Sequence, residues 1–196
     1  FMDGINGITG LYSLVVLVGF FVLNSINQQV DTNLIVFVLL SIVVFGYYNF
    51  RKKARMFAGD VGSISVAMVI LFLVLTFIIN LKAPVVLLLI AVYGIDSGLT
   101  ILYRIYLKEH IMEPHRHHIY QKLVDVWKWS HLKVSYVYSF IQVIISSIVI
   151  LSFKLPFSAQ LLISVGVLIL MSVGYMLVFK KMKLKWVDQE AKWQSK

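Results

Sequence analysis

The sequence predicts an all-α, polytopic membrane protein: a bundle of about six transmembrane helices joined by short loops. Two features of its composition favour this class. Of its 196 residues, 60% are hydrophobic and only 14% are charged, whereas a soluble domain carries roughly 25% charged residues. The lengths of its apolar runs also favour it: several are close to 20 residues long, the length that crosses a hydrocarbon layer of about 30 Å. The chain has no cysteine, which excludes disulfide bonds.

Each expected span is an apolar run bounded by polar or basic residues. Polar residues 27–32 separate the first two spans, basic residues 51–62 precede the third, and Lys82 separates the third from the fourth. Pro84 and Pro156 stand at helix starts, where a missing N–H group costs little. The expected spans are 8–26, 33–50, 63–81, 84–103, 134–153 and 157–179.

The distribution of Lys and Arg predicts the orientation of these spans. Sixteen of the 18 basic residues fall in 51–62, in 104–133 or in the tail from 180, which leaves Lys82 and Lys154 for the other side. Because cytosolic loops are enriched in Lys and Arg, we expect the three basic segments and both ends of the chain on the cytosolic side. The net charge of +9 then reflects topology, and no nucleic-acid partner is expected.

The chain divides into two expected regions. Residues 1–179 are expected to form a transmembrane region that carries the candidate site, and 180–196 a basic cytosolic tail with a weak affinity for anionic lipid headgroups.

A Gly-Asp motif in the stretch "NFRKKARMFAGDVGS", residues 49–63, is the first candidate for chemistry. Asp60 lies between Gly59 and Gly62, directly before an expected span. A carboxylate in this position suits a hard cation such as Mg²⁺, and a helix start offers N–H groups to an anion. The alternative is that Asp60 is only the N-cap of the helix.

The opening stretch "FMDGINGITG", residues 1–10, is a second polar loop on the same expected side. It holds Asp3, Asn6 and three glycines. Its spacing is not that of a phosphate-binding P-loop, and a flexible turn that leads into a helix is the alternative interpretation.

The stretch "IMEPHRHHIYQKL", residues 111–123, concentrates His115, Arg116, His117 and His118 in four consecutive positions. Arg pairs with phosphate through two hydrogen bonds and imidazoles donate further ones, which favours a phosphate-binding loop. Solvated loop histidines are one alternative. A zinc site is another, although no cysteine and only two nearby glutamates are present to complete it.

One carboxylate, Asp96, lies well inside an expected span. Intramembrane carboxylates are costly and usually functional. We expect Asp96 near the cytosolic end of its helix, on the same face as Arg104, which follows about two turns later.

Together these motifs resemble the polyprenyl-phosphate N-acetylhexosamine-1-phosphate transferases, the superfamily of phospho-N-acetylmuramoyl-pentapeptide-transferase and of the undecaprenyl-phosphate GlcNAc-1-phosphate transferases. "FMDGINGITG" is similar to the family's N-F-x-D-G-x-D-G-L stretch, with Asn6 in place of its second Asp. "NFRKKARMFAGDVGS" is similar to N-x-x-P-A-x-x-F-M-G-D-x-G-S, without the Pro-Ala pair. "HRHHIYQ" is similar to the histidine motif of the O-antigen-initiating branch, and "YGIDSGLTILYR" to the segment that precedes it. The upstream Asp-Asp loop of the family has no counterpart here, so we expect the chain to be the C-terminal portion of a larger transferase domain, inactive alone.

The resemblance implies transfer of a HexNAc-1-phosphate from a UDP-sugar to undecaprenyl phosphate, with release of UMP, to initiate a cell-envelope polysaccharide such as lipopolysaccharide O-antigen. UDP-GlcNAc is the default donor. The implied cofactor is Mg²⁺, with Mn²⁺ as the alternative, and Asp60 is its implied ligand. The implied catalytic residues are Asp60, His115, Arg116, His117 and His118; the implied substrate-binding residues are Asp3, Asn6, Asn49, Phe57, Tyr120 and Gln121.

The implied location is the bacterial inner (plasma) membrane, with the active site facing the cytosol. The expected partners are the UDP-sugar, undecaprenyl phosphate and the lipid bilayer, and a homodimer is left open. Two alternatives remain: a membrane transporter or assembly subunit, and an inactive truncated relative. Transporters often carry ionisable groups at the midplane, for which Asp96 is the one candidate here.

Overall fold

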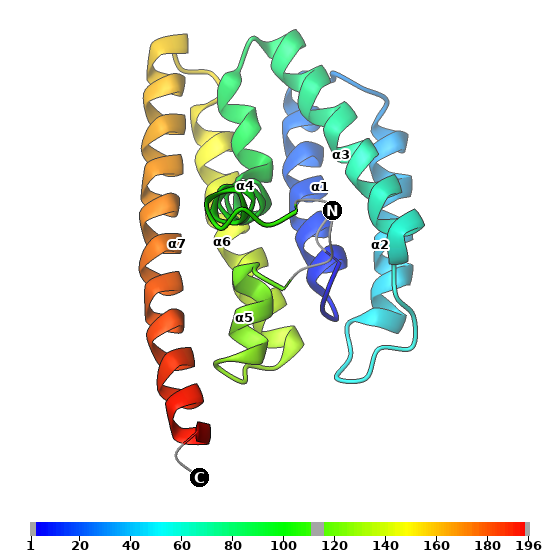
Figure 1. Ribbon diagram of the computed structural model, residues 1–196. Helices are drawn as coiled ribbons and strands as arrows, with labels where there is room; N and C mark the ends of the chain where they lie inside the picture. The colour runs from blue at the N-terminus through cyan, green and yellow to red at the C-terminus, as the bar shows by residue number, and fades with distance from the viewer. Residues whose placement is uncertain (1–2, 111–115, 195–196) are drawn as a thin grey trace.

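The computed structural model describes residues 3–110 and 116–194, with side chains given as far as Met182. The described residues form helices and no strand, which confirms the all-α prediction (Figure 1). The elements are α1 (Ile8–Asn27), α2 (Thr32–Asn49), α3 (Gly59–Leu81), the 3₁₀ helix η1 (Pro84–Ile90), α4 (Ala91–Tyr106), α5 (Ile119–Asp125), α6 (His131–Ser152) and α7 (Phe157–Gln194).

The prediction of six spans is confirmed. Six helical segments of the described residues are long and apolar enough to cross a membrane, as expected of a multi-pass membrane protein. They are α1, α2, α3, the joined segment Pro84–Tyr106, α6 and Phe157–Met182. The third begins at Gly59, not at 63, so Asp60 lies in a first helical turn.

Helix α1 lies at the centre of the bundle and α7 at its edge. The α1 side chains of Val16, Leu17, Phe20 and Leu23 are fully buried, and α1 packs against both α2 and α6. Figure 1 shows α7 along one edge of the molecule and α2 and α3 on the other side. Most apolar side chains of α7 before Lys180 are exposed or half-buried, as expected of a helix that faces lipid.

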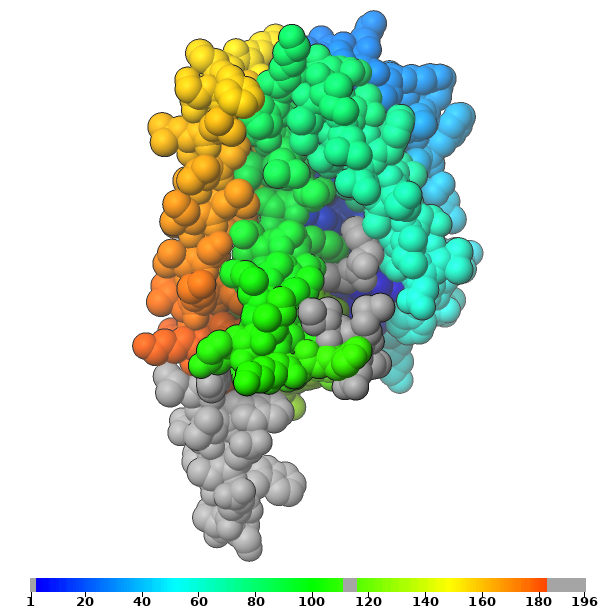
Figure 2. All heavy atoms as spheres, turned by 45° about the horizontal axis from the view of Figure 1, so that its top comes forward, coloured from blue at the N-terminus to red at the C-terminus, as the bar shows by residue number. Residues whose placement is uncertain are grey.

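The fourth span is not the single straight helix that the sequence suggests. Pro84 starts a 3₁₀ helix, η1, which leads into α4, and a seven-residue 3₁₀ segment is unusually long. In Figure 1 the later turns of α4 are seen end-on, whereas the other long helices run up and down the view. Figure 2 shows this part of α4 at the surface between α3 and α7.

The polar loops gather at one end of the bundle. Figure 1 shows the turn before α1, the α2–α3 loop and α5 at its lower end, and the α1–α2, α3–η1 and α6–α7 connections at the other. The second group contains Lys82 and Lys154. Helix α7 continues without interruption to Gln194, so the expected basic tail from 180 begins inside this helix.

Candidate functional site

The turn before α1 and the α2–α3 loop are joined by two buried asparagines. Asn49 accepts a hydrogen bond from the Gly7 N–H at 2.7 Å and donates one to the Met56 carbonyl at 2.7 Å. Asn6 donates to the carbonyls of Arg51 and Lys52, both at 3.3 Å. Both side chains, expected to bind substrate, therefore shape the two loops that border the site.

The same turn is attached to the start of α6. The Asn6 N–H donates to Nδ1 of His131 at 3.4 Å, and the Ser135 hydroxyl donates to the Asn6 carbonyl at 2.9 Å. Gly7 has a φ of +84° and lies so close to α6 that a Cβ would be 3.1 Å from the Leu132 side chain. Only glycine fits this left-handed, crowded position without strain.

Helix α5 packs directly on the Asp-Gly turn. A Cβ at Gly4 would lie 2.5 Å from the Tyr120 hydroxyl oxygen, so the two motifs are in van der Waals contact. Desolvation raises the pKa of Tyr120 above its usual value, and the negative charges of Asp96 and Asp3 raise it further. Tyr120 therefore stays protonated at neutral pH. Asp3 itself accepts a hydrogen bond from the Thr9 hydroxyl.

Gln121, the neighbour of Tyr120, is buried with 9% exposure. Its Oε1 accepts no hydrogen bond from the described residues. Because a buried carbonyl without a donor is costly, this atom is available to a ligand or a water molecule.

Asp60, in the first turn of α3, and Phe57, in the α2–α3 loop, are both exposed. The N-cap of α3 is Ala58, so the alternative that Asp60 is the N-cap is wrong. Gly59 has a φ of +59° and Asp60 follows it in the first turn, where a carboxylate is favoured by the helix dipole. The side chain of Phe57 is 67% exposed.

The described residues do not form a metal site from several side chains of their own. Among them, no group of three His, Asp or Glu side chains could hold a metal ion. Mg²⁺ is commonly held by one or two carboxylates together with substrate phosphates and water. The exposed carboxylate of Asp60 fits this type of site.

Arg116 forms a two-hydrogen-bond ion pair with Asp125 of α5. Its Nε lies 3.1 Å from Asp125 Oδ2, and its Nη2 donates to Oδ1 at 3.2 Å. The Arg116 side chain is 67% exposed, so an anionic ligand can approach it and compete with Asp125. His115 lies outside the described residues.

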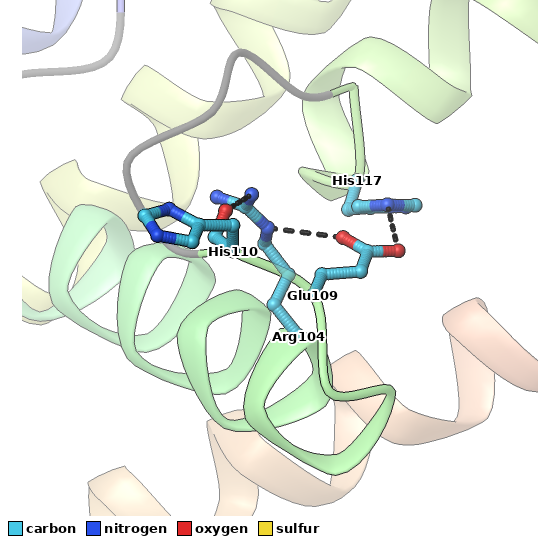
Figure 3. Close-up of polar contacts among 4 residues, drawn as sticks. All are labelled: Arg104, Glu109, His110 and His117. Carbon is cyan, nitrogen blue, oxygen red and sulfur yellow. Dashed lines mark hydrogen bonds and ion pairs between the residues drawn. The ribbon is translucent and has the colours of Figure 1, made fainter.

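His117 belongs to a polar cluster that closes the C-terminal end of α4 (Figure 3). Glu109 accepts from Nε of Arg104 at 3.1 Å and lies 3.1 Å from Nε2 of His117. Arg104 also donates to the carbonyl of His110. The Arg104 guanidinium is thus paired with Glu109. The sequence predicted only that Arg104 shares a helix face with Asp96.

The electrostatics of Glu109 favour its ionised form. Desolvation alone would raise its pKa, but the hydrogen bond from Arg104 and the charge of His117 outweigh it, so the pKa is lowered. The sequence motifs do not single out Glu109 for this role, because it lies beyond the end of α4 and five residues from Arg104, not at the spacing of three or four residues that pairs side chains on a helix.

His118 is the N-cap residue of α5 and is mostly buried. Its ring stacks on that of Tyr120, with centroids 5.4 Å apart, and its Nδ1 lies 3.4 Å from Oδ1 of Asp96. Asp96 is only 2% exposed, as expected of an intramembrane carboxylate.

The structure thus joins the Asp-Gly turn, which holds Asp3 and Asn6, to Asn49 and to Tyr120, which precedes Gln121 and stacks on His118. Asp60, Phe57 and Arg116 are exposed. Neither a curated protein nor a solved structure matches the chain. Residues 1–78, which include the Asp-Gly turn, the α2–α3 loop and Asp60, match the family model of glycosyl transferase family 4.

Proposed function

We propose that the protein transfers a HexNAc-1-phosphate from a UDP-sugar to undecaprenyl phosphate. A phosphate oxygen of the lipid attacks the β-phosphorus of the donor, the bond from that phosphorus to the bridging oxygen breaks, and UMP leaves. The observation that carries the proposal is the meeting of the Asp-Gly turn and the "HRHHIYQ" segment, through Gly4 and Tyr120, at one end of an apolar bundle. The match of residues 1–78 to glycosyl transferase family 4 supports it.

The charged residues of this end suit two anionic substrates. Phosphoryl transfer depends on positioning and on charge neutralisation. Arg116 presents a planar fork for a diphosphate in exchange for Asp125. His118 and His117 add imidazole donors from the same segment, and His115 is proposed to do the same. The basic residues of the α2–α3 loop attract both substrates electrostatically.

Asp60 is the residue proposed to hold Mg²⁺, which when bound would neutralise negative charge on the diphosphate oxygens. Phe57 offers an exposed ring for stacking on uracil, and the Oε1 of Gln121 can accept a hydrogen bond from a donor sugar or base. Asp3 remains a candidate for the nucleotide side of the pocket. We propose GlcNAc as the default sugar, the bacterial inner membrane as the location and the cytosol as the side of reaction.

The test is UMP release by the full-length protein in liposomes that contain undecaprenyl phosphate, with UDP-GlcNAc and Mg²⁺ supplied. His118→Ala and Arg116→Lys are expected to reduce turnover by roughly 10²–10³-fold each, because each removes a contact to developing charge. Lys154→Arg, at the opposite end of the bundle, is the matched control and should retain wild-type turnover. Wild-type protein that releases no UMP but moves a solute across the bilayer would favour the transporter alternative.

A further inference from the structure

The buried carboxylate of Asp96 has no part in the reaction proposed above, yet it lies inside a membrane-spanning segment with 2% exposure. A carboxylate in such surroundings is costly unless hydrogen bonds and a charged partner compensate for its lost hydration. Its contacts therefore indicate what keeps it there.

Hydrogen-bond donors from three helices converge on Asp96. Tyr138 of α6 donates its hydroxyl to Oδ2 at 2.7 Å. The N–H of Ile119, the first residue of α5, donates to Oδ1 at 3.1 Å, and the hydroxyl of Thr100 donates to the same atom at 3.4 Å. Thr100 in turn lies 2.9 Å from the hydroxyl of Tyr175 in α7. The carboxylate thus joins α4, α5 and α6 directly and α7 through Thr100.

A basic side chain, His118, lies close to Asp96: its Nδ1 is 3.4 Å from Oδ1, and the two side chains form an ion pair when the ring is protonated. This nitrogen is inaccessible to solvent, and its contact with the carboxylate is a close approach that does not have hydrogen-bond geometry. The distance is slightly longer than a typical N–H···O hydrogen bond, as is common for catalytic contacts before a substrate binds. With one ring nitrogen facing inward, the other, Nε2, is at the opposite edge of the imidazole.

Two further contacts restrict the His118 ring. Its stacking on Tyr120 keeps the two rings within 23° of parallel. The hydrogen bond from Ile119 to Asp96 fixes the backbone directly after His118. The same carboxylate therefore controls both the position of the backbone and the inward edge of the ring.

We infer that Asp96 is a positioning residue for His118: it pairs with the Nδ1–H edge of the ring, so that the Nε2 edge faces the phosphates of the substrate, to which the doubly protonated ring donates a hydrogen bond. A carboxylate that fixes the tautomer and orientation of an imidazole is a known device in enzymes and metal sites. The inference rests on the proposed function for the role of Nε2, while the pairing itself can be measured without turnover.

Asp96→Asn is the decisive variant, because an amide supplies one acceptor oxygen and an NH₂ donor where donors already converge. The expected result is a loss of kcat of roughly 10²–10⁴-fold with little change in KM, since a misplaced imidazole tautomer has a cost of this size elsewhere. Asp96→Glu should recover part of the rate. Asp31→Asn, which alters the N-cap of α2 at the opposite end, is the matched control.

A double-mutant cycle with His118→Ala separates positioning from a general structural role. If Asp96 acts through His118, Asp96→Asn should cause almost no further loss in the His118→Ala background. An equal loss in both backgrounds would overturn the inference. Tyr138→Phe, which removes one donor and keeps the carboxylate, should cost less than Asp96→Asn.

Nitrogen-15 NMR of histidine-labelled protein in liposomes tests the pairing independently of activity, with His118→Ala to assign the resonance. Wild type should show a protonated Nδ1 on His118 at neutral pH, and Asp96→Asn should change that signal. A wild-type Nδ1 without a proton would overturn the inference. A protonated Nδ1 in a protein that releases no UMP would refute the proposed function and leave the pairing intact.

Discussion

At the scale of single residues, Asp60 is the clearest candidate for metal binding, because its carboxylate is exposed in the first turn of α3. We predict that Asp60→Asn abolishes Mg²⁺-dependent UMP release, with a loss of at least roughly 10²-fold, and lowers thermal stability only slightly, through the lost interaction of the carboxylate with the helix dipole. Asn retains the size of the side chain but is a poorer ligand for Mg²⁺. Activity close to that of wild type at saturating Mg²⁺ would exclude Asp60 as the ligand.

Glu109 provides a prediction with a pH dependence. Its pKa is lowered by Arg104 and His117 despite desolvation. A lowered folded-state pKa means that the carboxylate adds stability above its unfolded value of about 4.3, and that this stability disappears as the pH falls through the folded value.

Glu109→Gln should therefore lower the melting temperature at pH 7, and the difference from wild type should shrink below about pH 4. Thermal unfolding in detergent across this pH range measures it. Because Glu109 is partly exposed, the effect should be small and should weaken further at high salt. A difference that grows as the pH falls would contradict the assignment.

At the scale of elements, one aromatic ring determines how α1 and α2 meet at the end of the bundle that carries the polar loops. The ring of Phe50 lies against Gly10 of α1 and Gly46 of α2. A Cβ would come within 2.5 Å of the ring at Gly10 and within 2.4 Å at Gly46. Phe50 is the C-cap of α2. Its ring fills the space between the two helices that the missing side chains of Gly10 and Gly46 leave open.

Gly46→Ala should destabilise the protein by about 1–3 kcal/mol, the usual cost of overpacking. Gly166→Ala in α7 is the matched control, because a Cβ at this position would have nothing within 4 Å, and Ala is the better helix former. Thermal unfolding in detergent compares the two. Adding Phe50→Leu to Gly46→Ala should recover part of the loss; an additive loss would show that the ring is not responsible.

At the scale of the whole molecule, the arrangement of basic loops predicts a membrane orientation. The chain has no cysteine, so single cysteines can be introduced and labelled without background. Cysteines at Lys82 and Lys154 should react with an impermeant maleimide in intact bacterial cells, whereas those at Lys52 and Lys128 should react only after lysis. Labelling of Lys52→Cys in intact cells would reverse the proposed sidedness.

The sequence by itself determined the fold class and the list of candidate residues. Apolar runs near 20 residues predicted six spans because a bilayer admits few other structures, and local motifs predicted where the polar chemistry lies. These are properties of consecutive residues, which can be recognised without knowledge of neighbours in space.

Tertiary structure decided which of those residues meet. Asn6 and Asn49 are far apart in the chain and bridge the same two loops, and Asp96 reaches Tyr138 and Ile119 on other helices. The 3₁₀ start of the fourth span and the pairing of Arg104 with Glu109 also came only from the structure. Such contacts depend on how helices pack, and packing is decided by side chains distant in sequence that periodicity does not identify.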